Sequence, residues 1–226
     1  MEITFISDTH HIVSDQEDRE DLTLLLPGGP ILVHAGDMSG RGTETEIRRF
    51  LDWFSKLPYT HKILIAGNHD FFFEIAQPEL VEALLADYPG ITYLNDSGIT
   101  IEGIKFWGSP VTPWFHNWAF NRLPQELEAH WDLIPNDTDV LITHGPPQGV
   151  LDKTIREGWS VGCKYLLKVV NRVNPKVHVF GHIHEGMGQI QIGNTLFINA
   201  SVVDERYHLY HEPVPVVNVE PKLPTF

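Results

Sequence analysis

The sequence predicts an α/β sandwich in which two mixed β-sheets pack face to face and helices flank them. In the first half of the chain, short apolar strands alternate with helices that have clear start and stop signals. In the second half, two hairpins join these alternating units. A chain of 226 residues can bury a sizeable core. We therefore expect residues 1–226 to form a single domain.

The first half contains three apolar runs that are typical of strands, namely Glu2–Ser7, Ile31–Ala35 and Lys62–Ala66. A helix is expected between the last two, because Thr43 and Glu46 have the spacing of a capping box. Its apolar positions follow helical spacing, and Pro58 ends it. A second helix is expected to begin near Pro78, since proline is favoured in the first turn.

The second half contains two runs that read as strand, tight turn and strand, ITI-EG-IKFW and QIQI-GN-TLFI. Other elements are expected between them and after them: helices near Gln125–Leu133 and Val161–Val173, strands at Val140–Thr143 and Lys176–Phe180, and a possible edge strand at Val216–Val219. Asn174-Pro175 ends the second of these helices.

Composition narrows the classes of function. The net charge of −14 argues against a nucleic-acid polymer as partner, because phosphate backbones bind clustered Lys and Arg. It does not exclude a small phosphate substrate, since bound cations reverse the local sign. Cys163 is the single cysteine, and we expect it to be structural. We see no basic-apolar leader and no apolar run of membrane length, so we expect a soluble cytoplasmic protein with no membrane partner.

Polar metal-ligating side chains follow five of the expected strands. In open α/β sheets, the carboxyl ends of the strands form the edge where ligands bind. Seven candidate ligands stand at such ends: Asp8, His10, Asp37, Asn68, His144, His182 and His184.

These residue types suit a pair of adjacent divalent cations. Such a pair needs carboxylate and amide oxygens, neutral imidazoles and one bridging ligand. Asp37 is the natural bridge, because a carboxylate is anionic and has two oxygens. Mixed nitrogen and oxygen ligation without thiolate favours Mn²⁺, Fe or Zn²⁺. The glycines before Asp37, Asn68 and His182 fit tight turns where a side chain would crowd the site.

The order of these motifs, D-x-H, G-D, G-N-H-D, H and G-H-x-H, resembles that of the calcineurin-like metallophosphoesterases. The resemblance runs from Asp8 to His184. Longer stretches resemble the compact metallophosphoesterase-domain-containing branch, which includes small phosphodiesterases: GDMSGRGTETEIRRFLDWFSKLPYTHKILIAGNHD, THGPPQGVLD and VFGHIHEG…INAS. The resemblance implies the metallophosphoesterase fold, a β-sandwich flanked by helices.

The resemblance also implies roles for individual residues. The first metal would be held by Asp8, His10, Asp37 and His184. The second would be held by Asp37, Asn68, His144 and His182. His69 would face the leaving group, with Asp70 behind it.

Three further residues are candidate catalytic groups. His69 is expected to act on the substrate as a general acid or charge stabiliser, and Asp70 to accept from its other ring nitrogen. The alternative is that His69 only hydrogen-bonds within its loop. Arg41 has the spacing of the arginine in the GD-x-x-D-R-G segment of phosphoprotein phosphatases, but Gly40 replaces the acidic residue before it. Arg41 is therefore either a phosphate clamp or a solvated loop residue.

Two other positions lie near the expected site. The loop GSPVTPWFHNWAFNR carries the aromatic residues Trp114, Phe115, Trp118 and Phe120. Aromatic rings can stack on a nucleobase, but we expect these to cover the core, with one ring at most lining the pocket. Asn199 follows a strand, and we expect it to support the metal site from behind the ligands.

The sequence thus predicts a dinuclear metal-dependent phosphoesterase. We expect a phosphodiesterase that hydrolyses small phosphodiesters, cyclic nucleotides among the candidates, by in-line attack of a hydroxide that bridges the two metals. The nearest alternative is a phosphomonoesterase or phosphoprotein phosphatase. A metal-binding scaffold with little turnover is an alternative of another class.

Overall fold

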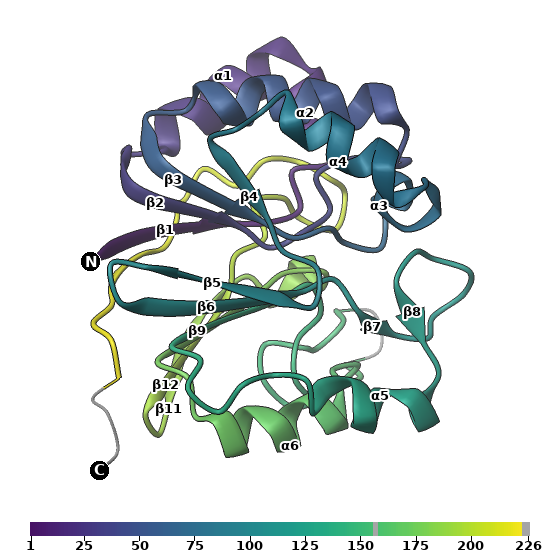
Figure 1. Ribbon diagram of the computed structural model, residues 1–226, viewed down its shortest axis with the longest axis vertical. Coiled ribbons are helices and arrows are strands. Elements are labelled where there is room, and N and C mark those ends of the chain that lie inside the picture. Colours follow the sequence, from purple (N-terminus) through teal and green to yellow (C-terminus); the bar gives the residue numbers. More distant parts are fainter. Residues whose placement is uncertain (156–157, 223–226) are drawn as a thin grey trace.

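Two β-sheets pack face to face, and helices cover the outer face of each sheet (Figure 1). The computed structural model describes residues 1–155 and 158–222. This is the architecture predicted from the sequence.

The first sheet has the strand order β13-β1-β2-β3-β4. Its strands are β1 (Glu2–Ile6), β2 (Gly29–His34), β3 (Tyr59–Leu64), β4 (Ile91–Tyr93) and β13 (Val216–Asn218). Strands β1 to β4 are parallel, and β13 pairs antiparallel with β1. The helices on its outer side are α1 (Gln16–Leu25), α2 (Glu44–Lys56), α3 (Phe71–Ile75) and α4 (Pro78–Ala86), and a 3₁₀ turn, η1 (Ile12–Ser14), precedes α1 (Figure 1).

The second sheet has the order β11-β12-β10-β9-β6-β5. Its strands are β5 (Ser97–Ile101), β6 (Ile104–Ser109), β9 (Val140–Thr143), β10 (Val177–Phe180), β11 (Gly188–Ile192) and β12 (Thr195–Asn199). The two predicted hairpins, β5–β6 and β11–β12, form its antiparallel edges. Helices α5 (Pro124–Trp131) and α6 (Lys164–Val173) cover it, and three short elements complete the fold: β7 (Thr112–Pro113), β8 (Asn121–Arg122) and the 3₁₀ turn η2 (His184–Gly186).

The alternation of side chains along each strand divides the apolar residues between two layers. In β1, Ile3 and Phe5 point between the sheets, whereas Ile6 points toward the helices. The layer between the sheets is completed from the second sheet by Phe106, Val140, Ile142, Val177, Val179 and Ile198. Both faces of each central strand are therefore buried, which explains their continuous apolar sequences.

Helix starts follow local capping chemistry. The predicted capping box at α2 is present: the Thr43 hydroxyl accepts from the Glu46 amide at 3.3 Å, and the Glu46 carboxylate accepts from the Thr43 amide at 3.0 Å. Helix α6 begins at Lys164, later than the predicted Val161. The reason is that Cys163 has extended backbone angles, and its buried sulfur accepts from the Leu166 amide at 3.4 Å.

Helix α1 was not predicted, because its apolar pattern is weak. Leu22 is the one fully buried residue that this helix contributes to the core. Its start is nevertheless encoded locally, since the Asp15 carboxylate accepts from the Glu17 and Asp18 amides. None of the described helices is long and apolar enough to cross a membrane.

The parallel strands of the two sheets bring their carboxyl ends to a common edge. A parallel bridge joins Ser7, after β1, to Ser201, after β12. The Asp8 amide donates to the Gly36 carbonyl at 2.9 Å, and the Gly181 amide donates to the His144 carbonyl at 2.9 Å. The loops that follow β1, β2, β9 and β10 are thus locked together, two by two, where the sheets end.

Candidate metal centre

The seven predicted metal ligands converge at this common edge. Their ligand atoms form adjoining groups, two of which are Asp8, His10 and His184, and Asp37, His144 and His182. Six of the seven residues are buried, and His182 is half-buried. Burying a cluster of carboxylates and imidazoles costs free energy unless cations or protons balance the charges.

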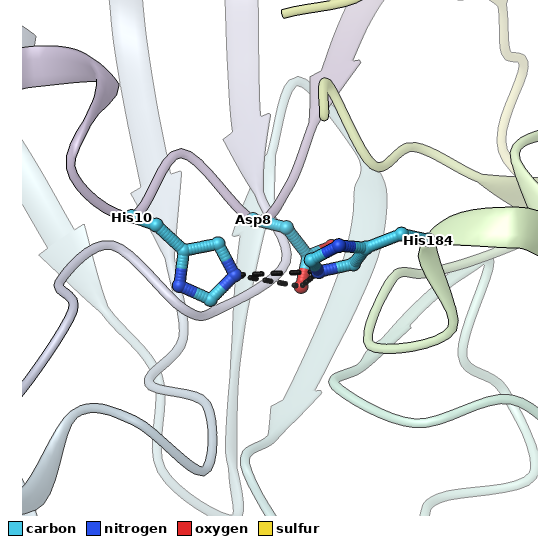
Figure 2. A group of neighbouring side chains, drawn as sticks. All are labelled: Asp8, His10 and His184. Carbon is cyan, nitrogen blue, oxygen red and sulfur yellow. Dashed lines mark hydrogen bonds and ion pairs between the residues drawn. The ribbon is translucent and has the colours of Figure 1, made fainter. Parts of the chain in front are cut away.

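The first group joins the loop after β1 to the turn after β10 (Figure 2). The His184 Nε2 lies 3.5 Å from the Asp8 Oδ1, and the His10 Nε2 lies 3.9 Å from the same oxygen. The two imidazole nitrogens are 3.3 Å apart. All three side chains therefore direct one ligand atom to the same point in space.

The second group joins the ends of β2, β3, β9 and β10. The His144 Nε2 lies 2.9 Å from the Asn68 Oδ1 and 3.2 Å from the Asp37 Oδ2. A ring nitrogen of His182 lies within 4.8 Å of a carboxylate oxygen of Asp37 and of a ring nitrogen of His144. These donors also surround one point.

Asp37 lies between the two groups. Its Oδ2 is 3.2 Å from the His144 Nε2 in the second group and 3.8 Å from the His10 Nε2 in the first. This is the position that a bridging carboxylate occupies between two cations.

The donor spacing fits small divalent cations. Donors that sit about 2.1 Å from one ion are roughly 3–3.5 Å from one another. The distances between 2.9 and 3.9 Å within each group lie close to this range. The donors are imidazole nitrogen, carboxylate oxygen and one amide oxygen, a set that suits Mn²⁺, Fe or Zn²⁺.

Three of the histidines are oriented by backbone carbonyls. Their Nδ1 atoms lie against the carbonyl oxygens of loops or strand ends: His10 against Ser39 at 3.2 Å, His144 against Ala35 at 3.0 Å and His184 against Asp204 at 2.9 Å. A carbonyl oxygen only accepts, so in the neutral ring the proton resides on Nδ1. The Nε2 lone pair then faces the metal position in each case.

The backbone of the site is strained in a way that indicates a functional constraint. Four of the candidate ligands have left-handed φ angles: Asp8 at 58°, His10 at 41°, Asp37 at 56° and His182 at 67°. Residues with a Cβ adopt this conformation rarely, and each instance costs on the order of 1–3 kcal/mol. The surrounding hydrogen bonds keep these residues in place in spite of that cost.

The predicted role of the glycines is confirmed, because the backbone and ligands approach each other too closely for a side chain. A Cβ on Gly181 would lie 2.0 Å from the Asp8 Oδ2. A Cβ on Gly67 would lie 2.3 Å from the Asp37 Oδ1 and 2.7 Å from the His144 ring. The two glycines thus allow one strand end from each sheet to reach the carboxylates.

The charges of the site are mutually dependent. Burial alone disfavours the charged form of His144, but the Asp37 carboxylate outweighs it and raises the pKa of His144 to about 9. Burial is outweighed in the same way at His184, where Asp8 raises the pKa to about 9. Burial dominates at His10, whose pKa falls to about 4. Without cations, the carboxylates hold protons on their imidazole neighbours, so metal binding must release these protons.

His69 lies beside the two groups. Its amide donates to the Asp37 Oδ1 at 2.8 Å, and its ring centroid is 4.8 Å from that of His10. The side chain is half-buried. Arg41 is exposed. The structure thus brings His69 to the metal edge and leaves Arg41 at its rim.

Asp70 does not contact the ring of His69, contrary to the prediction. Instead, the His69 Nδ1 lies 2.8 Å from the Gly40 carbonyl oxygen. The Asp70 carboxylate is turned away and buried, where it accepts from the amides of Gly67 and Ser39 at 2.8 and 3.0 Å and from the Ser39 hydroxyl at 2.6 Å. Asp70 therefore ties the loop after β3 to the loop after β2.

The aromatic side chains of the loop between β7 and β8 differ in how far they are buried. Phe120 packs into the core as predicted, whereas Trp114 and Phe115 are 56% and 58% exposed. The ring of Trp118 lies 4.3 Å from that of His69. The prediction of core packing was therefore wrong for Trp114 and Phe115, because the loop extends beyond the edge of the sandwich, whereas Trp118 is the one ring that lies beside the site.

Tyr207 also lies at the site, although the sequence did not predict it there. Its ring makes edge contacts with those of His10 at 4.9 Å and His184 at 5.4 Å. No strand or helix leads to it, and no motif marks it. Asn199, by contrast, lies behind the ligands as predicted, and its Nδ2 donates to the Ile183 carbonyl at 2.7 Å, between His182 and His184.

Comparison with known proteins identifies the family. The family model of the calcineurin-like phosphoesterases matches residues 1–186. The chain belongs to this family. It is therefore a metal-dependent phosphoester hydrolase by descent, which accords with the paired ligand groups at the sheet edge.

Two relatives and one solved structure illustrate the similarity. The chain is 41% identical to metallophosphoesterase domain-containing protein 1 of Homo sapiens, over 90% of this chain and 69% of that protein. It is 35% identical to a UPF0046 protein of Caenorhabditis elegans, over 95% of this chain and 74% of that protein. The structure of a phosphopantetheinyl hydrolase from Mycobacterium tuberculosis has a TM-score of 0.66 at 17% identity, covering 99% and 98% of the two chains. At that identity the likeness concerns the fold alone.

Proposed function

We propose that this calcineurin-like phosphoesterase hydrolyses small phosphodiesters. Asp8, His10, Asp37 and His184 would hold one cation, and Asp37, Asn68, His144 and His182 the other. The observation that carries the proposal is the position of Asp37, whose Oδ2 lies within 3.8 Å of an imidazole nitrogen from each group.

Two bound cations would supply Lewis acidity and a hydroxide nucleophile formed from water. The residues of the chain then have separate tasks. The carboxylates and imidazoles fix the cations at the sheet edge, and the strained loops hold these ligands in position before substrate arrives. No side-chain nucleophile is needed.

His69 is the group that would act on the leaving oxygen. Its amide is anchored to Asp37 at 2.8 Å, and its Nδ1 is occupied by the Gly40 carbonyl at 2.8 Å. The Gly40 carbonyl keeps a proton on Nδ1, so the doubly protonated ring would give its Nε2 proton to the departing alkoxide and remain as the neutral Nδ1–H form.

A diester is favoured over a monoester by the modest positive charge around the site. Arg41 is exposed, so no buried contact fixes it as a phosphate clamp. A diester carries one negative charge, which the two cations can balance without a further fixed cation. Cyclic nucleotides belong to this class of substrate, and the acidic chain charge of −14 disfavours a nucleic-acid polymer.

The proposal is tested by measuring the activity for each combination of metal ion and substrate. Bis(p-nitrophenyl) phosphate and p-nitrophenyl phosphate would each be offered to the purified protein with Mn²⁺, Zn²⁺, Fe²⁺ or Mg²⁺. We expect faster hydrolysis of the diester. A strong preference for the monoester would identify a phosphomonoesterase, and two bound cations with no turnover of either ester would identify a scaffold.

The role of His69 is tested by His69→Ala. We expect turnover to fall by about 10²–10⁴-fold, the usual contribution of a positioned histidine, while both cations remain bound. Metal content by mass spectrometry separates this effect from loss of the site. His211→Ala, which removes an exposed histidine, is the matched control and should leave turnover unchanged. Unchanged turnover in His69→Ala would show that His69 has no catalytic role.

A further inference from the structure

The indole of Trp118 lies against the ring of His69. The ring centroids are 4.3 Å apart, and the planes are inclined by 31°. Trp118 comes from the loop between β7 and β8 and is half-buried, in contrast to the exposed Trp114 of the same loop. This contact joins the aromatic loop to the loop that follows β3.

The loop that carries Trp118 is anchored directly after the contact. The Ala119 amide donates to the backbone carbonyl of the candidate ligand Asn68 at 3.1 Å. The Phe120 amide donates to the Glu74 carboxylate at 3.0 Å, and the Phe120 ring is buried. Because hydrogen bonds hold the residues directly after Trp118, the indole is kept in place against His69.

The ring of His69 has one hydrogen bond among the described residues, from Nδ1 to the Gly40 carbonyl at 2.8 Å. One hydrogen bond fixes a point on an imidazole but not the plane of the ring. The plane is bounded by two aromatic neighbours: the face of Trp118 on one side and the ring of His10, at 4.8 Å and 81°, on another. Together the three contacts determine where Nε2 points.

We propose that Trp118 is a positioning residue for His69 and aims its Nε2 at the leaving oxygen of the substrate. This inference rests on the role proposed for His69. Its physical basis is that a proton donor loses much of its effect when it is displaced by about 1 Å from the productive geometry. An indole packed at 4.3 Å limits the rotation of the imidazole ring, which a single hydrogen bond to Gly40 does not do.

The inference predicts a specific kinetic signature. A residue that orients a general acid affects turnover more than binding, and it matters most when the leaving group is a poor one. Trp118→Ala should therefore lower kcat by about tenfold to a hundredfold with little change in KM. The loss should be larger for a diester with a weakly acidic leaving phenol than for bis(p-nitrophenyl) phosphate.

Four variants and a control make the test complete. Trp118→Phe keeps a flat face and should recover most of the activity, whereas Trp118→Leu keeps bulk without the face and should not. In the His69→Ala background, Trp118→Ala should add almost no further loss, because the group that it orients is absent. Trp114→Ala removes an exposed indole from the same loop and should leave kcat unchanged. Metal content and thermal unfolding of each variant show whether the site and the fold are intact.

Three results would overturn the inference. They are a full additional loss in the His69→Ala background, a loss equal for both leaving groups, and a change confined to KM, which would make Trp118 part of the substrate-binding wall. Trp118→Leu and Trp118→Phe decide the question if Trp118→Ala does not fold. The proposed function fails separately, through monoester preference or through unchanged turnover in His69→Ala, and the latter result also removes the basis for a role of Trp118.

Discussion

The metal centre has two halves, the first ligand group around Asp8 and the second around His144. They differ in what orients their ligands. In the second half, His144 is fully buried, and its ring donates to Ala35 at the end of β2. In the first half, the rings of His184 and His10 donate to carbonyls of irregular loops, at Asp204 and Ser39. The second half is therefore built by the sheets themselves, whereas the first depends on loops that come from elsewhere in the chain.

This difference has a consequence for how the centre responds to change. Strand ends are held by the hydrogen-bond ladders of the sheet, so a ligand such as His144 moves only if the sheet moves. A ligand such as His184 depends on the 204–208 segment, where the Asp204 carboxylate accepts from the amides of Arg206 and His208 at 2.8 and 2.9 Å. We expect the first half to be the more easily lost.

The largest effect is expected from a substitution that disrupts both halves at once. Asp37→Ala deletes the carboxylate shared by both, so we expect both cations to be lost and turnover to fall by about 10³-fold or more. Metal content by mass spectrometry and kcat with a diester measure this. Asp37→Asn keeps an acceptor for the His69 amide but not the charge, and it should lose the cations as well. Retention of both cations in either variant would contradict the bridging position.

A smaller effect should separate the halves. Tyr207→Ala removes the ring that contacts His10 and His184, and we expect the affinity for the first cation to fall by about tenfold while the second is unaffected. Titration against a chromophoric chelator resolves the two binding steps. Tyr207→Phe keeps the ring contacts and should behave as the original protein does. An equal loss at both steps would show that the halves are not independent.

The last effect is on stability and not on metal binding or turnover, and it concerns a buried histidine behind the second half. The Thr143 hydroxyl donates to the Gly145 carbonyl at 2.8 Å, so it accepts from the His178 Nε2 at 2.9 Å. The His178 Nδ1 has no partner among the described residues, and burial lowers the pKa of His178 to about 3. Because the unfolded chain has the ordinary pKa near 6.5, it binds the proton first as the pH falls.

Stability should therefore be fully present above pH 6.5 and decline as the pH falls toward 3. Between pH 6.5 and 5, this group alone should lower the free energy of unfolding by roughly 2 kcal/mol. Urea unfolding at several pH values measures the slope. His178→Leu removes the titrating group. The loss of unfolding free energy between pH 6.5 and 5 should then be smaller by that amount. An unchanged slope would show that His178 is protonated in the folded protein.

Much of the fold could be predicted because its signals are local. The capping box at Thr43, the hairpin turns at Glu102-Gly103 and Gly193-Asn194, and the apolar runs of β9 and β10 are each read within a few residues. Helix α1 escaped prediction because it covers the core mainly through Leu22, so it has little amphipathic pattern. The first residues of β3, from Tyr59, were not predicted because Thr60 is exposed and polar and interrupts the apolar run.

The site, too, could be predicted only where its signals are local. The ligands could be placed together because each follows a parallel strand, and the geometry of a parallel sheet brings such residues to one edge. The partner of a side chain could not be predicted in the same way. Asp70 is adjacent to His69 in sequence, yet its carboxylate bonds to Gly67 and Ser39, because the turn that directs His69 toward Asp37 turns Asp70 inward.

The sequence by itself determined which residues stand at the strand ends, the donor chemistry that they offer and the glycines that let them meet. These follow from the short-range rules of strands and turns. Only the tertiary structure decided that Trp118 lies on His69 and that Tyr207 lies on His10 and His184. Those contacts join loops far apart in the chain, and their positions depend on how the two large sheets and the helices around them pack rather than on any pattern along the sequence.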